Sequence, residues 1–157
     1  MREIYRVLDA NLNRLREGLR VLEEVSRFVL NDNEMTAGLK DLRHQVATAA
    51  YGLPCGLMEL IEARKPTADV GAGSWTTREA SRNSLMALAT ANCKRIQEAA
   101  RVLEEFGKMC EGPSARSFKE IRFTAYELEI ELLKKLNESA CHSERSEESY
   151  PFAEHNQ

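Results

Sequence analysis

Leucines recur every three or four residues through the first part of the chain, which is the period of an amphipathic α-helix. They are Leu8, Leu12, Leu15, Leu19 and Leu22. This pattern predicts a long first helix over about residues 2–29. Asn31, Asp32 and Asn33 interrupt it and offer capping side chains for a second helix over about residues 34–51. The chain is therefore expected to begin with a helical hairpin.

The middle of the chain is less regular. A Gly-Leu-Pro run at positions 52–54 ends the second helix, and a short helical piece is expected over about residues 55–63. The next segment, residues 64–75 (RKPTADVGAGSW), has no helical period and predicts a connecting loop.

Two further helices are expected after this loop. Thr76 has the features of an N-cap, and Glu79 follows three residues later, as in a capping box. The third helix is therefore expected over about residues 77–109. Pro113 suits the start of a fourth helix over about residues 114–136.

The last segment, residues 137–157, is different in composition. It is rich in Ser and Glu and shows no apolar periodicity. Such a segment buries too little apolar surface to offset the entropy lost on ordering. We expect disorder from about Asn137, or order only through packing on a neighbour, with no part in function.

Two segments of the chain repeat. Residues 10–24 (ANLNRLREGLRVLEE) and 91–105 (ANCKRIQEAARVLEE) agree at nine of fifteen positions, at an offset of 81. A second pair, residues 39–43 (LKDLR) and 118–122 (FKEIR), follows in the same order at an offset of 79. Two matched pairs in one order indicate a tandem duplication.

We therefore expect an all-α fold, a helical bundle of two duplicated long-helix hairpins with pseudo-two-fold symmetry. The domain is expected to span residues 1–136. Its repeat units are about residues 2–54 and 77–136, joined by the loop at 64–75.

Composition and charge narrow the class of protein. The net charge of −3 over 157 residues gives no electrostatic footprint for nucleic acid. No apolar run approaches the roughly 20 residues that span a bilayer, and the N-terminus lacks the apolar core of a signal peptide. The four cysteines show neither CxxC spacing nor zinc spacing with the three histidines. We expect a cytoplasmic, reduced protein without a structural metal or membrane contact, in which Cys93 packs as a small apolar residue.

Polar residues stand among the apolar ones in both copies. On a helical wheel Asn11 falls in the middle of the apolar arc, and Arg14 falls within it. Asn92 and Arg95 occupy the same places in the second copy. Gly18 lies beside the first pair and leaves space. An arginine facing a core is costly unless its charge is paired, so these positions need an explanation.

Two interpretations remain open for these positions. In the first, Glu17 and Glu98 pair with the arginines across the pseudo-two-fold axis and form an internal polar network. In the second, the two asparagines and two arginines line a pocket between helices for a polar, anionic ligand.

Other charged residues give weaker signals. Lys40 with Arg43, and Lys119 with Arg122, form basic pairs at matching repeat positions. A further set is expected to form an ordinary solvated face with pairs three and four residues apart. Its members are Arg16, Arg20, Glu23, Glu24, Arg27, Arg101, Glu104 and Glu105.

The loop has no counterpart in the first copy. Its glycines, among them Gly71, allow backbone N–H groups to converge on an anion, and Asp69 is a candidate magnesium ligand. A plain connector explains the same composition equally well. Neither common glycine-rich nucleotide fingerprint is present.

Taken together, the repeated AN-x-x-R-x-x-E segments, the LKDLRH segment, the ADVG loop and FKEIRFTAYELE resemble a known family. It is the all-helical hydroxymethylpyrimidine-phosphate kinase family of thiamin biosynthesis, whose members occur alone or fused ahead of a thiamin-phosphate synthase barrel. The resemblance covers about residues 3–135. It implies phosphorylation of 4-amino-5-hydroxymethyl-2-methylpyrimidine phosphate to its diphosphate, with ATP and Mg²⁺.

The resemblance also selects site residues. The matching positions are Asn11, Arg14, Glu17, Asn92, Arg95 and Glu98, with Asp69 and Gly71 of the loop. Arg14 and Arg95 are expected to clamp the donor and acceptor phosphates, because phosphoryl transfer depends on charge neutralisation and positioning. Lys119 or Arg122 is expected to assist them.

The remaining roles follow the same chemistry. Asp69, Glu17 or Glu98 is expected to hold Mg²⁺, and Asn11 or Asn92 to bind the aminopyrimidine edge. The expected partners are the pyrimidine phosphate and the nucleotide, with a possible homo-oligomer and a functional link to thiamin-phosphate synthase. The alternative function is a non-catalytic helical module that binds a phosphorylated pyrimidine or assembles with that synthase.

Overall fold

The computed structural model describes residues 1–64, 82–110 and 113–147, with side chains up to Cys141. Every regular element in these ranges is helical, which confirms the all-α prediction. The elements are α1 (Arg2–Glu24), the π-helical turn η1 (Val25–Val29), α2 (Asn33–Tyr51), α3 (Leu57–Ala63), α4 (Leu85–Gly107) and α5 (Ser114–Glu147). No helix among the described residues is both long and apolar enough to cross a membrane.

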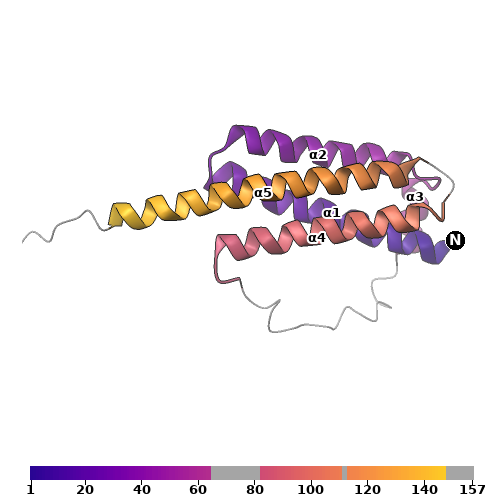
Figure 1. Cartoon of the computed structure of the whole chain (residues 1–157). Helices are drawn as coiled ribbons and strands as arrows, with labels where there is room; N and C mark the ends of the chain where they lie inside the picture. The colour runs from indigo at the N-terminus through magenta and orange to yellow at the C-terminus, as the bar shows by residue number, and fades with distance from the viewer. Residues whose placement is uncertain (65–81, 111–112, 148–157) are drawn as a thin grey trace, which may run out of the picture.

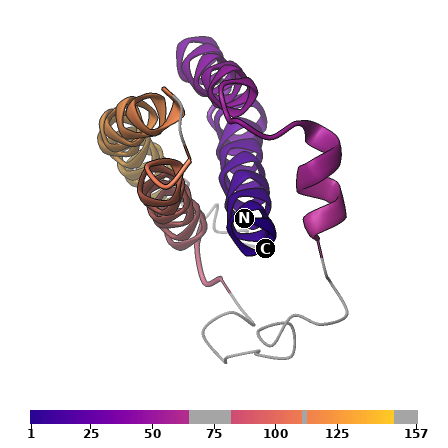
Figure 2. The same cartoon turned by 90° about the vertical axis from the view of Figure 1, so that its right-hand side faces the viewer.

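The four long helices form one bundle. Helix α1 packs against α2 and α4, and α5 packs against the same two helices, so the four make a closed ring of contacts. The short helix α3 packs on α1, on the side away from α4 (Figure 2). The last turns of α5 extend beyond the other helices (Figure 1).

The core lies along the inner faces of the ring. The leucine stripe of α1 that the periodicity singled out is buried, with no member more than 3% exposed. Phe118 and Leu132 of α5 are completely buried opposite it. Gly18 of α1 stands where α1 meets α4. A Cβ there would lie 2.8 Å from Cγ1 of Ile96 and 3.3 Å from the carbonyl oxygen of Asn92, so the glycine allows close helix contact.

Helix α2 begins as the sequence predicts. The Asp32 carboxylate accepts a hydrogen bond from the Met35 N–H (2.9 Å), which satisfies one of the free donors of the first turn. Lys135 of α5 donates a hydrogen bond to the other carboxylate oxygen of Asp32. Asn31, just before the cap, has a φ of 52°, a conformation that asparagine tolerates better than most residues. One side chain therefore starts α2 and ties it to α5.

The predicted start of the third helix is wrong. Residues 82–84 are not helical, and α4 begins at Leu85. Its cap is Ser84, whose hydroxyl accepts a hydrogen bond from the Ala87 N–H (3.0 Å). The predicted cap at Thr76 and Glu79 lies outside the described residues.

The predicted end of the fourth helix is also wrong. Helix α5 continues past Asn137 to Glu147. Residues 137–147 contain no Gly or Pro, so a helix already nucleated by packing can propagate at little cost. The rest of the predicted tail, residues 148–157, lies outside the described residues.

Candidate functional site

The two asparagines of the repeat bind their own helices. Asn11 is 5% exposed, and its side-chain amide donates to the carbonyl oxygen of Val7 (2.9 Å). Asn92 makes the same contact with Leu88 (2.9 Å). The Asn11 amide oxygen also accepts a long hydrogen bond from Arg14 (3.4 Å). Both amide groups therefore direct a donor to a carbonyl of their own helix.

The charged residues of the repeat motif lie at the surface. Arg14 and Arg95 are exposed, so the expectation that they face the core is wrong. The reason is that the apolar arc of α1 is narrower than the wheel suggested, since Val21 at its edge is only half-buried. Glu17 and Glu98 are exposed too, and within the described ranges neither forms an ion pair. The predicted internal network of these glutamates is therefore not formed there.

The buried charges belong to two other glutamates. Glu23 accepts from Arg43 (3.0 Å), and the equivalent Glu104 accepts from Arg122 (2.8 Å). The carboxylate side chains are only 8% and 6% exposed. Arg20 and Arg101, one turn earlier, add a second contact to each glutamate, at 3.3 Å and 3.0 Å respectively.

These pairs correct two predictions. Glu23 and Glu104 do not belong to a solvated face, although their neighbours Arg20 and Arg101 do. The basic pairs also separate, because Lys40 and Lys119 are exposed while the arginines three residues later turn inward to the glutamates.

The arginines around Glu104 favour the charged form of its carboxylate. Burial alone would raise the pKa of Glu104, but the hydrogen bond from Arg122 and the charges of Arg101 and Arg122 outweigh it and lower the pKa below its usual value. One guanidinium nitrogen of Arg122 donates a hydrogen bond to Glu104, and another donates to the Tyr126 hydroxyl (3.3 Å). Its Nε is buried without a hydrogen-bond partner. The predicted binding of substrate by Arg122 would therefore compete with these contacts.

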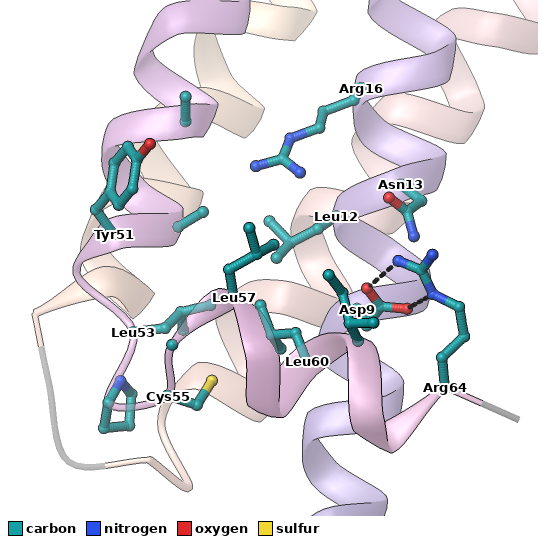
Figure 3. Close-up of a pocket in the computed structure, with 15 residues that line it drawn as sticks. Asp9, Leu12, Asn13, Arg16, Tyr51, Leu53, Cys55, Leu57, Leu60 and Arg64 are labelled. Carbon is teal, nitrogen blue, oxygen red and sulfur yellow. Dashed lines mark hydrogen bonds and ion pairs between the residues drawn. The ribbon is translucent and has the colours of Figure 1, made fainter.

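A cavity of about 670 Å³ opens between α1, α2 and α3 (Figure 3). Its apolar lining includes Leu12, Leu57 and Leu60. Arg16 reaches from α1 toward α2 across the cavity, and Tyr51 stands on the α2 side. The volume falls within the range of about 300–1,000 Å³ that is usual for small-molecule sites.

An ion pair closes one side of the cavity. Arg64, just after α3, donates two hydrogen bonds to Asp9 of α1, at 2.7 Å and 2.8 Å (Figure 3). This bidentate contact fixes the end of α3 against α1. The sequence analysis missed both residues, because neither is repeated: position 90 in the second copy is Thr90.

A groove of about 580 Å³ runs along α1 and α2 next to the cavity and shares Arg16 and Ala47 with it. Arg16, Glu17, Arg20, Val21, Arg43, His44 and Ala47 line this groove. Arg16 is half-buried and makes no hydrogen bond or ion pair with the part of the chain that the structure describes. The sequence analysis assigned it to the solvated face. Three arginines thus line the groove, and one of them, Arg16, also lines the apolar cavity beside it.

The described residues offer little for a metal ion by themselves. They contain no group of three or more His, Cys, Asp or Glu side chains placed to hold one. Mg²⁺ commonly needs only one or two carboxylates when substrate phosphates and water complete its shell. Glu17, which lines the groove among the arginines, fits that requirement. The other candidates, Asp69 and Gly71, lie outside the described residues.

The cysteines are free thiols. Cys93 is 2% exposed, as expected of a small apolar residue, and burial raises its pKa to about 12.

Comparison with known proteins places the chain in a family. The family model described as "ThiD2 family" matches residues 6–131. The thiamine-phosphate synthase of Rhodopirellula baltica is 42% identical over 135 residues, which cover 83% of this chain and 36% of that protein. The thiamine-phosphate synthase of Nostoc sp. (strain PCC 7120) is 41% identical over 130 residues, covering 83% of this chain and 35% of that protein.

A third relative, the thiamine-phosphate synthase of Thermosynechococcus vestitus, is 42% identical over 124 residues, covering 79% of this chain and 34% of that protein. The chain thus spans about a third of the length of the curated relatives it matches. No solved structure matches the chain. The matched region contains the four repeated segments and every residue that lines the cavity and the groove. The chain belongs to the ThiD2 family.

Proposed function

We propose that this protein is a phosphotransferase of thiamin biosynthesis that converts 4-amino-5-hydroxymethyl-2-methylpyrimidine phosphate to the diphosphate with ATP. The observation that carries the proposal is the family match, because the same helical region forms about a third of proteins named thiamine-phosphate synthase. A domain joined to a synthase in one chain is well placed to prepare that synthase's substrate.

The chemistry of the joining step supports this order. Thiamin phosphate joins a pyrimidine and a thiazole through the pyrimidine's exocyclic carbon, and that carbon needs a good leaving group. A diphosphate leaves more readily than a monophosphate. In the proposed reaction an oxygen of the acceptor phosphate attacks the γ-phosphorus of ATP. A new P–O bond forms, and the bond to the β-phosphate oxygen breaks, so ADP leaves with the electron pair.

The side chains supply what this transfer requires. Positive charge must neutralise the phosphates, and the groups must be held in line. Arg16 provides a charge at the groove that is unpaired among the described residues. Arg20 and Arg43 line the groove while paired with Glu23, and Glu17 would hold the Mg²⁺ that accompanies ATP. Bound Mg²⁺ would neutralise the transferring phosphate. No strong general base is needed, because the acceptor phosphate is already ionised.

Arg14 and Arg95 are proposed to bind the phosphates of ATP, while the groove arginines neutralise the acceptor phosphate. Both are exposed on helices that pack together, so phosphate groups can reach them. Asn11 and Asn92 are less suited to binding the pyrimidine edge, because their amide groups already donate to helix carbonyls.

The test is a coupled assay. The purified protein, Mg²⁺, ATP and the pyrimidine phosphate are combined with excess thiamin-phosphate synthase and its thiazole substrate. We expect thiamin phosphate to form only when this protein is present, and ADP to appear at the same rate. If folded protein yields no product while chemically supplied diphosphate does, the kinase proposal is wrong. The alternative, a non-catalytic binding or assembly module, would then hold.

A further inference from the structure

We propose that the first hairpin holds the acceptor, with its aromatic ring in the α1–α2–α3 cavity and its phosphate against the arginines of the α1–α2 groove. The ligand class is a phosphate ester of a flat, nitrogen-containing heterocycle. The inference rests on the proposed function for the identity of the compound. The site it names does not include Asn11, Arg14, Asn92 or Arg95 of the repeat motif.

The cavity suits a flat ring. Its walls are mainly apolar, and the polar groups stand at its edge, with Asn13 and the Asp9–Arg64 pair on one side (Figure 3). A heterocycle can bury its faces against leucines while Asn13 offers both a donor and an acceptor to the ring edge. Tyr51, 90% exposed at the opposite edge, is free to cover a bound ring.

Arg16 marks where the phosphate would lie. It belongs to both the cavity and the groove, and it makes no ion pair among the described residues. A half-buried guanidinium without a carboxylate partner is suited to an anionic ligand. Arg43 approaches the same groove and is held in place by Glu23. A phosphate there would be within reach of the ring in the cavity.

The second hairpin shows the same positions filled by protein. Gln97 replaces Arg16 in the repeat, and Glu129 replaces Ala50. Gln97 is buried and donates to Glu129 (2.7 Å), which also pairs with Lys94 (3.1 Å).

The aromatic residues complete this filling. Tyr126 replaces Ala47, and its ring meets Phe123 edge to face at 5.9 Å between ring centres. Phe123 itself stands where the first hairpin has His44. Tyr126 and Glu129 of the second hairpin are thus much larger than Ala47 and Ala50, which they replace. A hairpin that binds a ligand is expected to have an open groove and an unpaired arginine, and the described part of the first hairpin has both.

Direct binding tests the site without depending on turnover. Isothermal titration calorimetry would use the pyrimidine phosphate, the unphosphorylated pyrimidine and inorganic phosphate, each without ATP. Arg16→Gln and Ala47→Tyr introduce the residues of the second hairpin. The matched controls are Arg116→Gln on α5 and Ala37→Tyr on α2, two positions whose side chains are exposed.

We expect Arg16→Gln to weaken binding of the phosphate ester about tenfold or more and that of the unphosphorylated pyrimidine little, since a charge-assisted hydrogen bond is lost. Ala47→Tyr should weaken the binding of both compounds, because the tyrosine ring blocks the groove. The control variants should bind both compounds like wild type. Amide shifts in NMR should cluster on α1, α2 and α3 when the ester is added.

The outcomes separate the site from the function. Binding that depends on Arg16 and Ala47 but without phosphate transfer supports the site and refutes the kinase proposal. Normal transfer with Arg16→Gln and Ala47→Tyr both binding like wild type overturns the site and leaves the kinase intact. NMR shifts confined to the Arg14 and Arg95 face, or no binding of the ester, also overturn the site.

Discussion

The two hairpins share their buried ion pairs and differ in the grooves beside them. Glu23–Arg43 and Glu104–Arg122 occupy equivalent positions and make the same contact. Yet the first hairpin opens onto a cavity, whereas the second fills the equivalent positions with Gln97, Glu129 and two aromatic rings. The comparison teaches that the repeated Glu and Arg join the two helices of each hairpin, and that positions where the hairpins differ decide how much space is left for a ligand.

The largest difference should appear when the buried glutamates are removed. Glu104→Ala leaves Arg122, 13% exposed, with its charge buried, and should lower the free energy of unfolding by about 3 kcal/mol. Glu23→Ala should cost roughly half as much, because Arg43 is 25% exposed and can turn toward water. Urea unfolding followed by circular dichroism measures both.

Glu105→Ala is the control, since Glu105 is 44% exposed and should contribute little. Equal losses for Glu23→Ala and Glu104→Ala would show that the two hairpins bury their ion pairs equally in solution.

A smaller effect is expected from exchanging the groove residues. Tyr126→Ala removes a half-buried ring and its contact with Phe123, and should cost about 2 kcal/mol of unfolding free energy. Ala47→Tyr should cost less than about 1 kcal/mol, because the groove has room for the ring. Thermal and urea unfolding give both values. A loss of stability from Ala47→Tyr as large as that from Tyr126→Ala would mean that the first groove is closed.

The link between the hairpins should depend on pH. The hydrogen bond from Lys135, and then that from the Met35 N–H, lower the pKa of Asp32 below its usual value. A lowered pKa means that the stabilisation is fully present above the unfolded value of about 3.9 and is lost as the pH falls through the folded value. Asp32→Ala should cost about 1–2 kcal/mol near neutral pH through the lost cap and ion pair.

Unfolding of wild type and Asp32→Ala between pH 2 and 7 gives the measurement. Asp32→Asn, which can still cap α2, is the matched control and should lose less than Asp32→Ala at neutral pH. The difference between wild type and Asp32→Asn should disappear at low pH. A difference that is constant over the whole range would exclude the charge of Asp32 as its cause.

Much of the fold was predictable from local pattern, and much of the candidate site was not. The period of the leucines predicted α1, and Asp32 predicted the start of α2, because both signals act over a few residues. The start of α4 was misassigned because Thr76 with Glu79 has the pattern of a capping box, whereas the observed cap, Ser84, has Ala87 at the corresponding position. Asp9 and Arg64 are 55 positions apart and unrepeated, so their pairing depends on how α3 folds back on α1.

Helical-wheel reasoning also failed for Arg14 and Glu23 for one reason. The wheel ranks positions by angle, but burial depends on which neighbour covers each angle. Helix α2 covers the Glu23 side of α1 and supplies Arg43, whereas Arg14 lies at an uncovered edge. The repeat carried information that the wheel lacked: Glu23, Arg43, Glu104 and Arg122 all recur, and that recurrence could have suggested the two ion pairs.

The smallest effects should come from the outer arginines, and they test whether the hairpins differ only at their inner partners. Arg20 and Arg101 are 53% and 54% exposed and contact Glu23 and Glu104 from one turn earlier. Exposed ion pairs contribute little to stability. Arg20→Ala and Arg101→Ala should therefore each lower the free energy of unfolding in urea by about 0.5 kcal/mol, the same amount in both hairpins. If Arg101→Ala proved much more costly than Arg20→Ala, the outer contact would explain the stronger second cluster. Equal small losses, set against unequal losses for the two glutamates, would assign the difference to the depth at which Arg43 and Arg122 are buried.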